Sequence, residues 1–154
     1  PVRASGQGGL LDVALHPDFA RNRTIYLTYA HGDASANRTR LARAVLDGHA
    51  LRDVRVIFEN NRDKPADSQF GSRLLFLPDG TLLMTVGDGG NPPISLDGRF
   101  IRENAQDLGN HLGKIIRLNN DGSVPIDNPY RTTAGARPEL WSVGHRNPQG
   151  LAWD

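Results

Sequence analysis

The stretch Leu74–Val86, LLFLPDGTLLMTV, sets the expectation for the fold. Two apolar runs flank Pro78-Asp79-Gly80, in which the proline presets one turn dihedral angle and the glycine tolerates a positive φ. Short apolar runs joined by such a turn are typical of a β-hairpin. The sequence therefore predicts a pair of antiparallel strands at this point in the chain.

Strand-like segments recur on both sides of this hairpin, and turn signals such as Asp47-Gly48 and Asp121-Gly122 separate them. Only Asn104–His111 has the pattern of a helical turn or two. The predicted strands are Leu10–His16, Thr24–Ala30, Thr39–Leu46, Val54–Glu59, Arg73–Leu77, Leu82–Gly87, Lys114–Leu118, Leu140–Val143 and Gly150–Trp153.

A weak internal repeat favours a radial all-β design. The segment Leu11–Asp18 resembles Arg73–Asp79, and Leu151–Asp154 resembles the start of a third copy. Such repeats are typical of β-propellers, whose blades are four-stranded sheets. The chain holds about three blades' worth of sequence and stops inside an apolar pattern. We therefore expect residues 1–154 to be a single incomplete β-propeller domain, open at its C-terminal end.

Composition excludes several classes of protein. The chain has 18 Lys and Arg against 17 Asp and Glu, and it has no cysteine, which rules out disulfides and thiolate metal sites. No basic run is interleaved with aromatic residues, so nucleic acid is not an expected partner. No stretch approaches the ~20 apolar residues of a membrane span. Residues Pro1–Ser5 show no apolar signal-peptide core.

Two polar clusters precede predicted strands. In Gly6-Gln7-Gly8-Gly9 the glycines allow close approach of a ligand, and the Gln7 amide can donate and accept hydrogen bonds. In Asp67–Arg73, Gln69 is the candidate for a side chain that faces a central channel. Each cluster is also compatible with an ordinary turn.

Two further clusters follow predicted strands. Asp88, in Gly87–Pro93, is either a functional carboxylate or part of an Asp-Gly-Gly turn. In His145–Gly150, consecutive imidazole, guanidinium and amide groups need partners. Arg146 could grip a carboxylate and Asn147 could bridge donors and acceptors, so this cluster favours a ligand site.

Four segments, in order along nearly the whole chain, resemble the soluble pyrroloquinoline-quinone (PQQ)-dependent sugar dehydrogenase family, which includes aldose sugar dehydrogenases and soluble glucose dehydrogenases. They are GQGGLLDVALHPDF (6–19), FGSRLLFLPDGTLLMTVGDGG (70–90), AQDLGNHLGKIIRLNNDGSVPIDNP (105–129) and PELWSVGHRNPQGLAWD (138–154). The resemblance implies a six-bladed β-propeller that oxidises the C1 hydroxyl of a sugar to the lactone by hydride transfer to PQQ, with calcium polarising the quinone.

The resemblance also implies roles for individual residues. Gln7 matches a glutamine that lines the active site at the cofactor, and Asp88 matches an aspartate beside the catalytic base. Arg146 and Asn147 match residues that contact PQQ. The family's calcium ligands are expected beyond residue 154, so no metal ligand is assigned in this chain. The resemblance further implies a sugar substrate, an external electron acceptor and a periplasmic or secreted location, and it allows a homodimer.

One departure from the family bears on catalysis. The family usually has a histidine immediately before Phe-Gly-(Gly/Ser)-Arg as the general base, and this chain has Gln69. A neutral amide can orient a hydroxyl but cannot hold its proton. Three explanations are open: Asp88 serves as the base, the substrate differs from a simple aldose, or the protein binds PQQ or a sugar without efficient turnover. His16 and His111 are expected to be structural.

The sequence therefore predicts a PQQ-dependent sugar dehydrogenase in which Gln69 and Asp88 face the sugar C1. The alternative is a non-catalytic propeller that binds a sugar, PQQ or a protein partner. The substitution at Gln69 favours the alternative, whereas the intact segments around Asp88 and Arg146 favour the enzyme.

Overall fold

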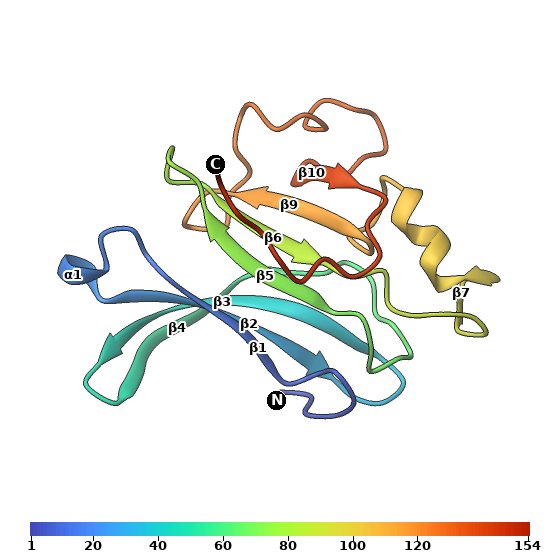
Figure 1. Ribbon diagram of the computed structural model, residues 1–154, viewed down its shortest axis with the longest axis horizontal. Coiled ribbons are helices and arrows are strands. Elements are labelled where there is room, and N and C mark those ends of the chain that lie inside the picture. Colours follow the sequence, from blue (N-terminus) through green and yellow to red (C-terminus); the bar gives the residue numbers. More distant parts are fainter.

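The strands form two four-stranded antiparallel sheets in the computed structural model, which describes residues 1–154 (Figure 1). Neighbouring strands in each sheet follow one another along the chain, apart from one insertion, so each sheet is a meander. The first sheet has the order β1-β2-β3-β4, with β1 (Leu10–Leu15), β2 (Thr24–Gly32), β3 (Asn37–Asp47) and β4 (Ala50–Glu59). The second has the order β5-β6-β9-β10, with β5 (Gly71–Phe76), β6 (Leu82–Val86), β9 (Lys114–Leu118) and β10 (Leu140–Val143). These are the four-stranded units expected of propeller blades.

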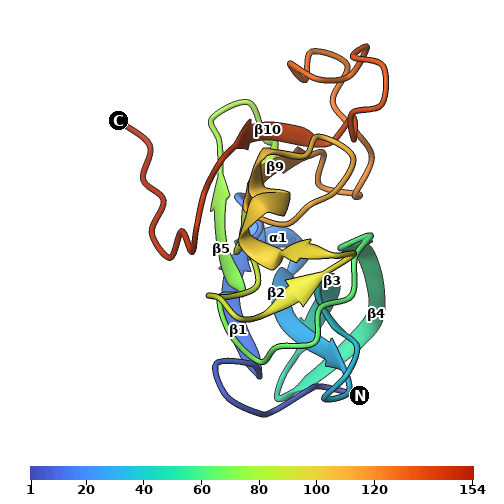
Figure 2. The ribbon, with the colours of Figure 1, turned by 90° about the vertical axis from the view of Figure 1, so that its right-hand side faces the viewer.

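The insertion between β6 and β9 carries the remaining regular structure of the second half. A two-residue turn joins β7 (Ser95–Leu96) to β8 (Arg99–Phe100), and the 3₁₀-helix η1 (Ile101–Gln106) follows directly. This insertion lies at one end of the second sheet (Figure 2). The short helix α1 (Phe19–Asn22) lies between β1 and β2. No helix in the chain is both long and apolar enough to cross a bilayer.

Two local predictions were wrong. Gly150–Trp153 forms no strand, because the segment after β10 leaves the sheet and crosses over β5 and β6. The expected turn in Asn104–His111 is the 3₁₀-helix Ile101–Gln106 instead. It ends there because the Asp107 carboxylate accepts the N–H of Gly109 and starts a turn. The other eight predicted strands are present, with ends shifted by a few residues.

The core lies between the two sheets. Tyr26 and Leu41 from the first sheet pack against Met84 and Ile116 from the second, and all four are fully buried. The hydroxyl of Tyr26 donates to the carbonyl of Asn120 at 2.9 Å, which satisfies the polar end of this ring. Burial of such side chains is the main stabilising contribution, roughly 1.5–3 kcal/mol for each.

A carboxylate joins β1 and β5, the edge strands of the two sheets. Asp12 on β1 accepts the backbone N–H of Leu74 at 2.8 Å and an Arg73 N–H at 3.1 Å, both from β5. Because the charge-assisted bonds reach backbone and side chain at once, they fix β1 beside β5. These bonds thereby hold β1 and β5 next to each other.

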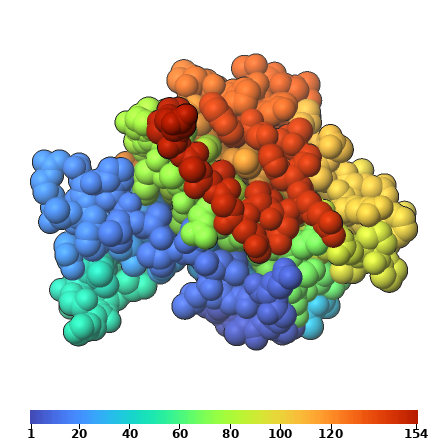
Figure 3. Space-filling view, viewed as in Figure 1, coloured from blue at the N-terminus to red at the C-terminus, as the bar shows by residue number.

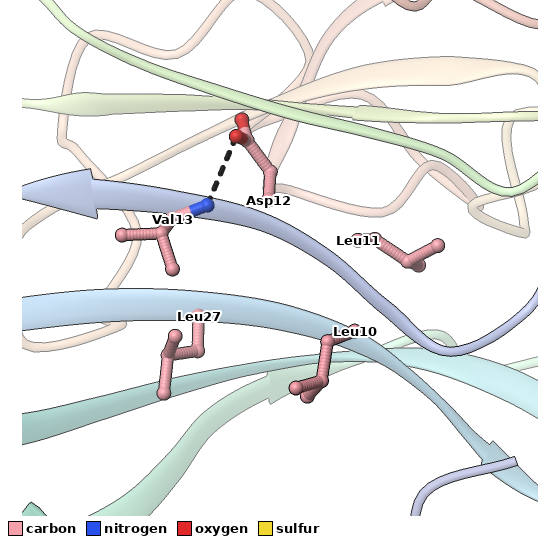
Figure 4. Close-up of a pocket in the computed structure, with 5 residues that line it drawn as sticks. All are labelled: Leu10, Leu11, Asp12, Val13 and Leu27. Carbon is pink, nitrogen blue, oxygen red and sulfur yellow. Dashed lines mark hydrogen bonds between the residues drawn. The ribbon is translucent and has the colours of Figure 1, made fainter. Parts of the chain in front are cut away.

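The opposite face of the first sheet is also apolar. Cross-strand pairing places four residues in one row across β1 to β4: Val13, Leu27, Ala42 and Val56. Val13 is 56% exposed, and it lines a groove of about 330 Å³ with Leu10, Leu11, Asp12 and Leu27 (Figure 4). The sheet is therefore apolar on both faces, as is typical of a sheet that packs between two others.

Candidate functional site

The four polar clusters of the sequence lie at one edge of the two sheets. In an antiparallel meander, the starts of alternate strands and the ends of the strands between them share an edge. The segments before β1 and β5 therefore meet the segments after β6 and β10. Backbone hydrogen bonds join Gly87 to Phe70 and Asp88 to Arg146 across this edge.

Gln7 and Gln69 are in direct contact. The side-chain oxygen of Gln7 accepts the backbone N–H of Gln69 at 2.7 Å, and the backbone N–H of Gln7 donates to the carbonyl of Asp67 at 2.8 Å. Gln7 was predicted to line the site at the cofactor. Its oxygen is used to hold the loop before β5, which leaves its amide N–H groups for another ligand.

Gln69 has an unusual backbone and an unused acceptor. Its φ is +50°, in the left-handed region that few side chains adopt without support, and Gly71 and Ser72 also have positive φ values. The Gln69 side-chain oxygen is buried and has no hydrogen-bond partner. A buried acceptor without a partner is costly, and such sites are associated with ligand binding and catalysis.

Asn147 contacts the loop before β5, which carries Gln69, from the C-terminal segment. Its side-chain oxygen accepts the backbone N–H of Gly71 at 3.0 Å. The following residues continue across the sheet, where Thr85 donates to the carbonyl of Pro148 at 2.7 Å. In Figure 3 this C-terminal segment (dark red) lies over the surface beside the green β5 and β6 strands. Asn147 therefore connects the C-terminal segment to the Gln69 loop.

Gly87 is the tightest point of the site, and we expect Gly87→Ala to lower the free energy of unfolding by about 3 kcal/mol. A Cβ at this position would lie 1.9 Å from the carbonyl oxygen of Gln69 and 2.4 Å from its carbon. Both are backbone atoms of a constrained loop, so relief requires moving the loop. Urea denaturation measures the loss. Gly150→Ala is the matched control because a Cβ there meets nothing within 4 Å. Equal stability of the two variants would contradict the expectation.

Asp88 lies immediately after this contact and is 3% exposed. Its carboxylate accepts the N–H of Gly90 at 3.0 Å. Burial raises the pKa of Asp88 above its ordinary value, and the Gly90 hydrogen bond and the charges of Arg146 and Arg102 act in the opposite direction. A buried carboxylate with a raised pKa at the wall of a cleft has the properties of a general base.

Arg146 and Asp88 line the same cleft. Its volume is about 370 Å³, and its other lining residues come from η1 and from the end of β10: Arg102, Glu103, Ala105, Gln106, Gly144 and His145. The Arg146 side chain is exposed and donates to the side chain of Asn91. The cleft thus presents the guanidinium groups of Arg102 and Arg146 beside the carboxylates of Asp88 and Glu103, and a guanidinium group can bind an anionic group of a ligand.

The histidines have structural contacts, as expected for His16 and His111. His16 packs on Tyr26 and Phe76 and accepts the N–H of Asp18 at 3.0 Å. The buried His111 ring accepts the N–H of Asn61 through Nδ1, so its Nε2 carries the proton and donates to Glu139 at 2.9 Å. Burial lowers the pKa of His111 and keeps the ring neutral. Neither histidine lines the cleft.

Sequence reasoning missed two features of this edge. Arg102 and Glu103 reach the cleft because the β7–β8 hairpin turns the chain back toward it. The Asp97-Gly98 dipeptide at the hairpin turn was an available signal. Lys64 is buried beneath the Gln69 loop, and no sequence pattern marks it.

Comparison with known proteins gives a consistent assignment. The family model described as "Glucose / Sorbosone dehydrogenase" matches residues 1–154. The chain is 63% identical over 151 residues to an uncharacterized protein of Synechocystis sp. and 40% identical over 154 residues to an aldose sugar dehydrogenase of Escherichia coli. It is 32% identical over 173 residues to quinoprotein glucose dehydrogenase B of Acinetobacter calcoaceticus. These matches cover 97–98% of this chain but 37%, 39% and 34% of the respective relatives.

Solved structures give the same result at the level of the fold. The apo form of the soluble aldose sugar dehydrogenase of Escherichia coli matches with a TM-score of 0.88 and 38% identity, over 99% of this chain and 42% of that one. The PQQ-bound form of an aldose sugar dehydrogenase from Streptomyces coelicolor matches with a TM-score of 0.75 and 33% identity, over 99% and 41%. The predictions of an all-β propeller part and of the family are confirmed.

Proposed function

The chain belongs to the glucose/sorbosone dehydrogenase family, and we propose that the protein oxidises the C1 hydroxyl of an aldose sugar to the lactone, with PQQ as hydride acceptor. The observation that carries the proposal is the meeting of Gln7, Gln69, Asp88, Arg146 and Asn147 at one sheet edge. These residues come from clusters up to 140 positions apart in the sequence.

The residues present fit PQQ as a ligand. PQQ carries carboxylates, and the exposed Arg146 guanidinium beside the cleft can bind one of them bidentately. The free amide groups of Gln7 and Asn147 would hydrogen-bond to its polar edge. When bound, PQQ supplies a two-electron acceptor for hydride. We propose calcium as the second cofactor, with no ligand assigned among residues 1–154.

Within this proposal, Gln69 and Asp88 act on the sugar hydroxyl. The unpaired oxygen of Gln69 accepts the hydrogen of a hydroxyl and orients it. Asp88 takes the C1 hydroxyl proton, for which its burial is suited, since desolvation strengthens a carboxylate as a base. The Asp88–Gly90 hydrogen bond keeps the carboxylate in place.

Residues 1–154 are proposed to form one incomplete propeller domain. The chain spans 34–39% of the length of the curated relatives described above. The apolar row on the first sheet, in which Val13 and Val56 are exposed, is suited to packing against a further sheet. The external electron acceptor, a homodimer and a periplasmic or secreted location remain predictions from the family.

A non-catalytic binding protein is the second candidate. Gln69 occupies the position of the family's usual base histidine, and this single substitution favours binding without turnover. Both candidates place PQQ or a sugar at the same edge, so binding alone does not separate them.

Reconstitution of the full-length protein with PQQ and calcium tests the proposal. An absorbance titration measures PQQ binding, and reduction of a dye measures turnover on several aldoses. Binding with turnover supports the dehydrogenase, and binding without turnover supports the second candidate. Absence of PQQ binding would show that PQQ is not the ligand in either candidate function.

We expect Arg146→Ala to raise the Kd for PQQ about tenfold. A hydrogen bond between charged groups contributes about 1.5–3 kcal/mol, and the exposure of Arg146 favours the lower value. The same titration measures the change. Arg21→Ala is the control, because Arg21 lies on α1 with 80% of its side chain exposed and away from the cleft. An unchanged Kd in Arg146→Ala would contradict a contact with the cofactor.

A further inference from the structure

Lys64 is a buried charge that the proposed reaction does not use. The chain has only two lysines, Lys64 and Lys114, and sixteen arginines carry the rest of its positive charge. Lys64 is 2% exposed. Lysine is among the residues least often fully buried, and its burial costs several kcal/mol unless its donors find acceptors.

The loop before β5 wraps around this ammonium group. Its Nζ donates to the carbonyl of Ser68 at 3.0 Å and to the carbonyl of Ala66. The same nitrogen lies 3.4 Å from the centroid of the Phe70 ring, in a cation–π contact. Three alternate residues of one short segment therefore face a single charge, and Gln69 lies between the last two of them.

Lys64 also supports the segment that carries Asp88. A Cβ on Gly89 would lie 3.1 Å from the Lys64 side-chain carbon Cδ, so the aliphatic stem packs against this backbone. The Ser68 hydroxyl donates to the Gly89 carbonyl at 3.3 Å. The lysine thus lies beneath both segments that face the sugar in the proposed site.

No carboxylate pairs directly with the ammonium. Asp67 acts on it through its charge, but the Asp67 carboxylate is hydrogen-bonded to Arg3 at 2.7 and 3.1 Å. An apolar side chain of similar length would fill the space without the cost of burying a charge. The ammonium group, unlike an apolar side chain, donates hydrogen bonds to two backbone carbonyls close to Gln69, whose φ is +50°.

We propose that Lys64 is a positioning residue whose ammonium group holds the Ala66–Phe70 loop in the conformation that presents Gln69 to the site. The role of Gln69 at a sugar site rests on the proposed function, but the stabilisation of the loop by Lys64 does not. Because a charged donor forms hydrogen bonds roughly twice as strong as a neutral one, the hold depends on protonation.

Burial lowers the pKa of Lys64 to about 7. Its charge is therefore present below this pH and is lost as the pH rises. The charged group that acts on it is Asp67, which is paired with Arg3. Asn37 of β3, which bridges to the Lys64 backbone, is uncharged. The order of the loop should consequently fall as the pH rises through the pKa of Lys64.

Selective labelling of lysine tests the proposal in the absence of PQQ and sugar. Two lysines give two NMR signals, and Lys114→Met identifies that of Lys64. Hydrogen exchange of the Gln69 and Gly71 amides, corrected for intrinsic rates, measures loop order. We expect their protection to fall about tenfold with a midpoint equal to the pKa of Lys64. Lys114→Met and Asp88→Asn should keep this step.

Lys64→Met should show low protection at every pH, with no step. If that variant does not fold, the unsubstituted protein still tests the proposal, through a comparison of the Lys64 pKa with the pH midpoint of amide protection in the loop. A midpoint that differs from the Lys64 pKa, or unchanged protection in Lys64→Met, would overturn the proposal. Failure of the dehydrogenase assignment would leave both measurements unaffected, so the two failures are distinguishable.

Discussion

Replacing Asp88 by asparagine is expected to lower kcat for aldose oxidation about 10²–10⁴-fold, the usual contribution of a positioned general base. Asparagine keeps an oxygen that can accept the Gly90 N–H, so the local geometry is retained. What it loses is the ability to take the C1 hydroxyl proton. Dye-linked turnover of the full-length protein, saturated with PQQ, measures the effect. The Kd for PQQ should stay within a few-fold.

The pH dependence provides a second readout of the same residue. Because burial raises the pKa of Asp88, the carboxylate takes up a proton at a higher pH than an exposed aspartate. Turnover should therefore fall on the acidic side with a midpoint above 3.8, the ordinary value. This acidic limb should be absent from the residual activity of Asp88→Asn.

Asp88→Asn should lower turnover but raise the stability of the folded protein. The folded protein binds the Asp88 proton more tightly than the unfolded chain, so ionised Asp88 destabilises the folded state once the pH exceeds its folded pKa. Asp88→Asn should then raise the free energy of unfolding at neutral pH. Asp18→Asn is the control, since Asp18 is exposed and lies at the start of α1. A turnover loss equal in both variants would contradict a specific role for Asp88.

The strands and the site clusters could be predicted because their signals are local. The Pro78-Asp79-Gly80 turn and the apolar runs beside it determine one hairpin, and similar turns mark the other strand ends. In an antiparallel meander, placing polar clusters at strand ends already places them at common edges. The family resemblance was what placed Gln69 and Asp88 together at one site, and the backbone hydrogen bond from Gly87 to Phe70 brings their two loops side by side.

Features that depend on tertiary contacts could not be predicted. Gly150–Trp153 has an apolar pattern, but no strand lies beside it to pair with. The carbonyls of the two preceding residues, Pro148 and Gln149, accept hydrogen bonds from side chains of β6 and β5 instead. The burial of Lys64 depends on the path of a loop that contains no periodic signal. The orphaned oxygen of Gln69 depends on a left-handed φ that the sequence did not indicate.

The position of Gln69 is compatible with histidine. Its φ of +50° is tolerated by histidine better than by most residues. The contact to Gln7 is made by the backbone N–H of Gln69, so it survives a change of side chain. The contacts of Lys64 to the loop go to the carbonyls of Ala66 and Ser68 and survive as well.

Gln69→His is accordingly expected to raise kcat by about 10²-fold or more above pH 6.5, where the imidazole is neutral and can accept a proton. The gain should be larger in the Asp88→Asn background, because the imidazole there replaces the lost carboxylate base. A double-mutant cycle would therefore report strong non-additivity. Gln69→Asn is the matched control, since it offers an amide and no base, and it should give no gain. If Gln69→His binds PQQ but leaves kcat unchanged, proton removal is not what limits this protein, and the difference must lie in how the substrate is held.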